Sequence, residues 1–264
     1  MGASAFGLAM LATLLAGCNT ASNGHNLSGV RLHQSGQHQQ ALQRFQQAIA
    51  SDPVNPDSYY NMASTLHEMA MQRHNLAIQF EGQAQQRQQE NRIAEAEALL
   101  AQAETVGAEA DKYYEQAETL YNQCLDHDTS HLDCHRALAV LLVETNRSDK
   151  AFTLLKRWAE RDAASPEPRI ELARLYEEFN QLDTSRRYLE EAVQLDVNSS
   201  RAWAALARVR EQTGDTQQAL ADYQRAYSLD NLQPGVATKI ASLQQQINRG
   251  MAVVPASATT TIFR

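Results

Sequence analysis

The 264-residue sequence has little of what enzymes and nucleic-acid-binding proteins need. It contains no glycine-rich phosphate loop and no G-x-S-x-G motif, and "HEMAM" at residues 67–71 lacks the second histidine of a zinc-protease motif. Lys and Arg number 23 against 31 Asp and Glu, and no run of five or more basic residues occurs that could bind a phosphate backbone. We therefore expect no catalytic residues, no cofactor and no nucleic-acid partner.

Glycine, proline and aromatic residues are also scarce. Eleven Gly and six Pro leave few turn-forming positions, and aromatic residues make up only 6% of the chain. Hydrophobic residues still amount to 43%, a fraction to which alanine, the best helix former, contributes heavily. This composition favours long helices and an all-α fold.

An uncharged, apolar stretch occupies residues 3–17. It is too short for a transmembrane helix, which needs about 20 apolar residues, and it has the form of a secretory signal. Its end, "LAGC" at residues 15–18, resembles the lipobox of bacterial lipoproteins, whose signal is cut before the cysteine. The resemblance implies loss of residues 1–17, a lipid on Cys18 and, because Asn19 follows, an outer-membrane location facing the periplasm. The alternative is an apolar first helix packed on the protein.

The second half of the chain repeats with a period of 34 residues. In residues 200–233, Trp203, Leu206, Gly214 and Ala219 mark two amphipathic helices joined by a Gly-Asp turn. This unit resembles the tetratricopeptide repeat, which implies a right-handed superhelical solenoid of helix-turn-helix repeats. Further units are expected at residues 22–55, 56–131, 132–165 and 166–199, followed by a capping helix at 234–249 and a flexible tail at 250–264.

The unit at residues 56–131 is 42 residues longer than one repeat. Ala63, Ala70, Ala77 and Ala84 recur every seven residues, and apolar or small residues from Ile93 to Tyr121 alternate steps of three and four. This spacing predicts an antiparallel helical hairpin inserted in the second repeat, at about residues 70–112 with its tip near 85–92. The alternative is two separate segments within a loop.

The one cluster that could carry chemistry is "CLDHDTSHLDCH" at residues 124–135. The repeat frame places Cys124 and Cys134 next to each other at a repeat junction, where they could form a disulfide in an oxidising compartment. Packed thiols with solvated histidines, or a zinc site that includes His127, His131 and His135, are the alternatives. Metal is the least favoured of the three, so we assign no metal-binding residues.

In the resembling family the first helix of each repeat lines a concave groove that binds partners. Carried onto this chain, the family's groove positions give the candidate partner-binding residues Tyr60, Ser64, His67, Glu68, Asp133, Arg136, Val140, Glu144, Glu167, Ile170, Arg174, Glu177, Arg201, Arg208 and Glu211. A solvated face is the alternative interpretation of these charges. Of the residues that clamp a peptide carboxylate in one subset of the family, only Asn61 is present, so that mode of binding is not expected.

These features favour a lipid-anchored scaffold of the cell envelope that binds protein partners or extended peptide segments through its groove and hairpin. We expect it to act in assembly of an envelope complex such as a pilus or secretion system. An adaptor that recruits a cell-wall enzyme is the first alternative, and the projecting hairpin favours it. A cytoplasmic tetratricopeptide adaptor is the second, and it requires the lipobox to be accidental.

Overall fold

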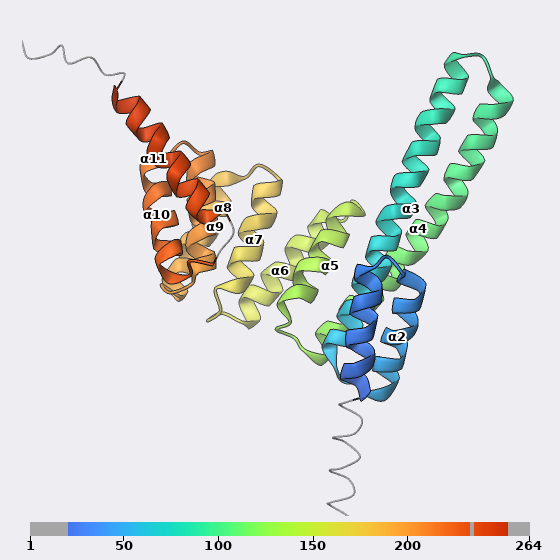
Figure 1. The fold of residues 1–264 in the computed structure, drawn as a ribbon, viewed down its shortest axis with the longest axis horizontal. Helices are drawn as coiled ribbons and strands as arrows, with labels where there is room; N and C mark the ends of the chain where they lie inside the picture. The colour runs from blue at the N-terminus through green and yellow to red at the C-terminus, as the bar shows by residue number, and fades with distance from the viewer. Residues whose placement is uncertain (1–20, 233–234, 253–264) are drawn as a thin grey trace, which may run out of the picture. The chain divides into compact units, whose positions relative to one another are not determined.

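The computed structural model of the protein describes residues 21–232 and 235–252, and every regular element in those ranges is a helix (Figure 1). The all-α expectation is confirmed. Cys18 and the rest of the predicted signal lie outside the described residues, as does most of the predicted tail. The chain divides into two units, residues 1–151 and 152–264, with the boundary inside one helix.

Unit 1 is a series of antiparallel helices. It contains a first helix at residues 21–34, then α2 (His38–Ser51), α3 (Pro56–Gln89), α4 (Ile93–His127), α5 (Leu132–Glu144) and the start of α6 (Ser148–Arg161). Unit 2 contains the rest of α6, followed by α7 (Glu167–Glu178), α8 (Leu182–Leu195), α9 (Ser200–Gln212), α10 (Thr216–Leu229) and α11 (Val236–Ala252). Each repeat unit predicted from the sequence thus corresponds to two consecutive helices.

In each repeat, the same kind of turn joins the two helices, and the turn is built on a residue with positive φ. These residues are Gly36, Asn91, Asn146, Asn180 and Gly214, with φ between 56° and 87°. At each turn this residue donates its N–H to the carbonyl three residues back, and the next residue donates to the carbonyl five back. The pattern is a Schellman motif, which satisfies the last carbonyls of the first helix and reverses the chain. Glycine and asparagine tolerate this conformation better than other residues.

The helices α3 and α4 are 34 and 35 residues long and run antiparallel as one hairpin (Figure 1). A 34-residue period counted from Gly36 would place the next turn at residue 70, but the turn residue is Asn91, which is 21 residues later. At about 1.5 Å per residue, this difference lengthens each helix by roughly 30 Å.

Alanine forms the contact surface between α3 and α4. The residues at the seven-residue spacing are at most 6% exposed: Ala63, Ala70, Ala77 and Ala84 on α3, and Ala96, Ala103, Ala110 and Ala117 on α4. Ile93 and Leu100, which the sequence pattern places in the same seam, are 49% and 41% exposed and lie at its edge. Small side chains at these positions let the two helices approach closely.

The core of unit 2 has two adjoining parts. One packs Ile170, Leu189 and Leu206 between α7, α8 and α9. The other packs Ala207, Tyr223, Val236 and Leu243 between α9, α10 and α11. The apolar face of α11 therefore covers the last helix pair, as a capping helix does in repeat proteins.

Candidate functional site

A cavity of about 680 Å³ opens on the face of unit 2 where α7 and α9 run side by side. Four of the candidate partner-binding residues form part of its wall. The complete lining is Ile170, Arg174, Leu189, Arg201, Ala204, Ala205, Arg208, Tyr223, Asp230, Gly235, Val236 and Lys239. Helices α7 to α11 all contribute, and the cavity is large enough for a few residues of an extended peptide.

The wall of this cavity carries four cationic side chains and one carboxylate. The cations are Arg174, Arg201, Arg208 and Lys239, and the carboxylate is Asp230. Each cation contacts a glutamate. Arg208 makes two bonds to Glu177, from Nε at 3.0 Å and from a terminal nitrogen at 2.9 Å, and Lys239 Nζ donates to Glu211 at 2.8 Å. Such charge-assisted, two-point contacts fix the plane of a guanidinium.

Arg201 is held by two glutamates of the preceding repeat. It contacts Glu167, one repeat length earlier in the sequence, and Glu171, whose side chain is 1% exposed. Arg174 also contacts Glu171, at 3.1 Å. A buried carboxylate needs charged partners to offset its lost hydration, so these contacts are part of the fold as well as of the cavity.

A tyrosine on α10 completes the polar wall. The Tyr223 hydroxyl donates to Glu211 at 3.1 Å. Burial, followed by the negative charge of Glu211, raises the pKa of Tyr223 above its ordinary value. The phenol therefore stays protonated at neutral pH and remains a hydrogen-bond donor. The repeat register does not assign Tyr223, Lys239 or Asp230 to the groove, because they come from the second helix of a repeat, the capping helix and the segment that precedes it.

The candidate partner-binding residues of unit 1 are used differently. His67 is buried and its Nε2 lies 2.7 Å from Glu144 Oε2. The Tyr60 ring lies 6.2 Å from that of Tyr121, centroid to centroid. Burial, followed by the charge of Asp133, raises the pKa of Tyr60. His67 and Tyr60 thus make contacts between helices, from α3 to α5 and from α3 to α4.

The remaining groove positions of unit 1 are partly exposed or paired locally. Ser64 and Val140 are partly buried, and Arg136 contacts Asp133 on the same helix at 3.4 Å. Glu68 approaches His33 at 3.4 Å.

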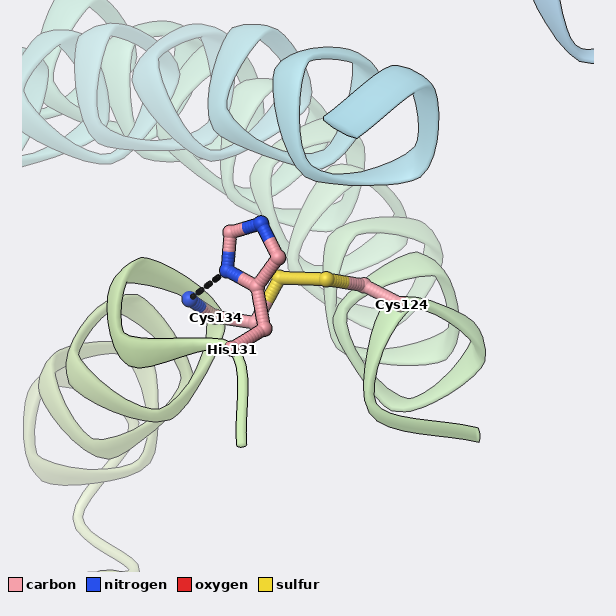
Figure 2. A group of neighbouring side chains, drawn as sticks. All are labelled: Cys124, His131 and Cys134. Carbon is pink, nitrogen blue, oxygen red and sulfur yellow. Dashed lines mark hydrogen bonds between the residues drawn. A yellow bond between two sulfur atoms is a disulfide. The ribbon is translucent and has the colours of Figure 1, made fainter. Parts of the chain in front are cut away.

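Figure 2 shows the cysteine and histidine cluster at the junction of α4 and α5. The structure joins Cys124 and Cys134 by a disulfide with a Cα–Cα distance of 6.6 Å, and both residues are fully buried. His131 Nδ1 accepts the Cys134 N–H at 3.2 Å and so caps the first turn of α5. His131 Nε2 lies 3.1 Å from Asp57 Oδ1 on α3.

This arrangement corresponds to the first of the three interpretations of the cluster. A thiolate is the form of cysteine that binds zinc, and sulfurs that are bonded to each other are not available as thiolates. His127 contributes to packing, with its ring 5.0 Å from that of Tyr59. His135 Nδ1 lies 3.1 Å from the His131 carbonyl oxygen. The cluster therefore joins α4 to α5 and α5 to α3.

None of the helices within residues 21–232 and 235–252 is both long and apolar enough to cross a lipid bilayer.

Sequence comparisons identify the repeats. A family described as "TPR repeat" matches residues 29–69, and families described as "Tetratricopeptide repeat" match residues 108–167, 149–209 and 200–231. Together these matches span more than half of the sequence. No curated protein sequence matches the chain.

Solved structures of tetratricopeptide-repeat proteins are similar to the chain at low sequence identity. The chain is 16% identical to TTC0263, a thermophilic TPR protein of Thermus thermophilus, with a TM-score of 0.53 over 85% of this chain and 100% of that one. MamA from Desulfovibrio magneticus RS-1 is 14% identical, with a TM-score of 0.44 over 81% and 97%. YrrB, described as a TPR protein with an unusual peptide-binding site, is 12% identical, with a TM-score of 0.39 over 85% and 90%.

Proposed function

Because this chain belongs to the tetratricopeptide-repeat family, we propose that it is a protein-binding scaffold whose unit 2 cavity holds an extended peptide segment of a partner. The observation that carries the proposal is the cavity wall, where the cations Arg174, Arg201, Arg208 and Lys239 gather beside apolar residues of the same lining. A guanidinium carries five N–H donors, and Arg208 directs two of its nitrogens to Glu177. The other N–H donors of Arg208 can bond to a carboxylate of a peptide.

The test is binding to an array of random-sequence peptides. The full chain is compared with Arg208→Ala and with the matched control Arg225→Ala, which changes an exposed arginine on α10 outside the cavity. We expect the wild type to retain peptides rich in Asp and Glu, and Arg208→Ala to weaken their binding at least tenfold. Equal losses in the two variants, or retention of peptides with no carboxylate side chains, would contradict the proposal.

The location we propose is the periplasmic face of the outer membrane, with the chain anchored by a lipid on Cys18 and acting in assembly of an envelope complex such as a pilus or secretion system. Two features support this. The LAGC sequence at residues 15–18 resembles a lipobox. The disulfide between Cys124 and Cys134 belongs to the class of bond that persists in oxidising compartments and is rare in the cytosol.

Metabolic labelling with a fatty acid, followed by intact mass measurement, tests the anchor. We expect the wild type to carry a diacylglycerol-sized adduct and to lack residues 1–17, and Cys18→Ser to carry no adduct. An unmodified, cytosolic wild-type chain would contradict the envelope location and would favour a cytoplasmic adaptor that binds peptides through the same cavity.

The α3–α4 hairpin favours a second candidate function, recruitment of a cell-wall enzyme, because a peptide-binding solenoid alone needs no projecting arm. Deletion of residues 78–84 together with 97–103 removes one heptad from each arm and keeps the alanine spacing and the tip. A photo-crosslinker at Gln88 then identifies the protein that meets the tip. Crosslinks to a cell-wall hydrolase or synthase that disappear in the shortened variant would support recruitment, and unchanged crosslinks would argue against it.

A further inference from the structure

Three potential metal ligands converge where the first helix, α2 and α3 meet. His33 Nε2 lies 3.4 Å from Glu68 Oε2, and His38 Nε2 lies 3.9 Å from Glu68 Oε1. The three ligand atoms all lie within 4.8 Å of one another. The histidine side chains are 26% and 14% exposed and that of Glu68 is 46% exposed, so an ion among them can be reached from solvent.

The turn between the first two helices brings the two histidines together. His33 precedes the turn and His38 is the first residue of α2. Gly36, with φ of 75°, reverses the chain between them, and its N–H donates to the His33 carbonyl at 2.9 Å. The two imidazole rings are consequently 5.5 Å apart, centroid to centroid.

A buried threonine sets the tautomer of His33. Thr65 Oγ1 donates its single hydrogen to the Asn61 carbonyl at 2.9 Å, so the same oxygen can only accept from His33 Nδ1 at 3.1 Å. A neutral His33 that donates from Nδ1 to Thr65 has its lone pair on Nε2, the nitrogen that faces Glu68. Ligating histidines are commonly held in this way by a hydrogen bond to the other ring nitrogen.

The second histidine is arranged similarly. The Gln72 amide nitrogen, a donor, lies 3.4 Å from His38 Nε2 and donates to Glu68 Oε1 at 3.3 Å. When Gln72 donates to it, His38 Nε2 is an acceptor, and the buried Nδ1 has no hydrogen-bond partner among the residues that the structure describes. The two imidazole Nε2 atoms and the Glu68 carboxylate thus face one another, so a cation placed among them would contact all three side chains.

We propose that His33, His38 and Glu68 form a binding site for one divalent transition-metal ion, zinc being the ion whose ligand preference they fit. Two histidines and one carboxylate form a known zinc ligand set, and ligand atoms about 2.0–2.2 Å from a tetrahedral ion are about 3.3–3.6 Å apart. The distance between His33 Nε2 and Glu68 Oε2 meets that value as it stands, whereas His38 Nε2, which is 3.9 Å from the other carboxylate oxygen, must move closer to bind the same ion. The proposal departs from the expectation, drawn from the sequence, that no metal-binding residues are present.

Three protein ligands leave the fourth tetrahedral position open. A cavity of about 430 Å³ adjoins the cluster and is lined in part by His38, Gln72 and Arg73. Water or a side chain of a bound partner can supply the fourth ligand from this cavity. The bound ion joins the first helix, α2 and α3, so it stabilises the packing of these three helices. The site is independent of the peptide-binding cavity, which belongs to unit 2.

The test is a titration of the oxidised full chain, with its Cys18 thiol alkylated, with Zn²⁺ in competition with a chromophoric chelator. We expect one ion per chain, with at least tenfold weaker binding in each of His33→Gln, His38→Gln and Glu68→Gln. His74→Gln is the matched control, because His74 is an exposed histidine of α3 outside the cluster. Thr65→Val is expected to weaken binding about tenfold, as loss of a group that orients a ligand does.

Two further measurements keep the result unambiguous. Circular dichroism without metal establishes whether each variant is folded. If a histidine variant is not folded, Glu68→Gln alone decides the test. Absorption of the Co²⁺-loaded chain is expected to show four-coordinate d–d bands without a thiolate charge-transfer band. Wild-type affinity no better than that of Glu68→Gln, an equal loss in His74→Gln, or a thiolate band would each overturn the proposal.

Discussion

His67 of α3 and Glu144 of α5 are 77 residues apart in sequence, and their Nε2 and Oε2 atoms lie 2.7 Å apart. His67 is 7% exposed, and the ring of Tyr114 packs edge-on against it at 5.7 Å between centroids. The Tyr121 hydroxyl lies 3.4 Å from its other ring nitrogen. The repeat register assigns both His67 and Glu144 to the partner-binding face, but the contact between them holds α5 against the base of the α3–α4 hairpin.

Glu144→Ala is expected to destabilise the protein by about 1–3 kcal/mol, because it leaves a buried histidine without its charged partner. The free energy of unfolding measured by urea denaturation checks this. The matched control is Glu97→Ala on α4, an exposed glutamate, which should change the free energy by no more than about 0.5 kcal/mol. Equal effects of the two substitutions would show that the contact contributes nothing to stability.

Two glycine-to-alanine substitutions are expected to have opposite effects. A Cβ at Gly107, inside α4, would meet nothing within 4 Å, so Gly107→Ala should stabilise by up to about 1 kcal/mol through helix propensity. A Cβ at Gly29 would lie 2.4 Å from Cε1 of the buried Phe45 ring, so Gly29→Ala should destabilise by about 1–3 kcal/mol. Thermal unfolding of both variants measures the signs, and a stabilised Gly29→Ala would contradict the close packing of the first helix on α2.

Alkaline pH should weaken the hairpin base through Tyr114. Burial, followed by the charges of Glu144 and Asp111, raises the pKa of Tyr114 to about 12. In the unfolded chain this phenol loses its proton near its ordinary value of 10, so between pH 10 and about 12 the unfolded state binds fewer protons and stability falls as pH rises. Below pH 10 this residue contributes no pH dependence.

The difference between the wild type and Tyr114→Phe isolates this effect from that of the other tyrosines. As pH rises from 10 to 12, the free energy of unfolding of the wild type should fall relative to that of Tyr114→Phe, because the variant lacks the titrating phenol. The tyrosinate absorbance difference between the two proteins should have its midpoint near pH 12. A midpoint near pH 10 would show that the Tyr114 hydroxyl is solvated.

Removal of the disulfide is expected to cost about 2–3 kcal/mol, the chain-entropy value for a loop of the ten-residue separation between Cys124 and Cys134. The double substitution Cys124→Ser and Cys134→Ser, compared with the oxidised wild type in urea, measures it. Reduction of the wild type should lower its stability toward that of the variant and leave the variant unchanged. An unaltered wild type after complete reduction would show that the bond does not contribute to stability.

The repeat pattern was readable in the sequence because each helix pair buries the same small set of positions. Leu206, Gly214 and Ala219 mark the fifth repeat by spacing alone, and the structure places helices α9 and α10 there. The turns at Asn146 and Asn180 are less apparent in sequence, since asparagine replaces the glycine that marks the turns at residues 36 and 214. Both residue types adopt the left-handed conformation, and only the backbone shows that the turns are equivalent.

What the sequence determined by itself was the all-α class, the 34-residue period and the alanine spacing of α3 and α4, because these follow from local periodicity and helix propensity. Only the tertiary structure decided which polar residues meet. The pairs His67–Glu144 and Arg208–Glu177, and the approach of Glu68 to His33 and His38, join different helices of the chain. Repeat register fixes the face on which such residues lie, but the partner of each depends on how neighbouring helices pack. Burial then determines whether a charged group remains available for binding or is used to hold the fold together.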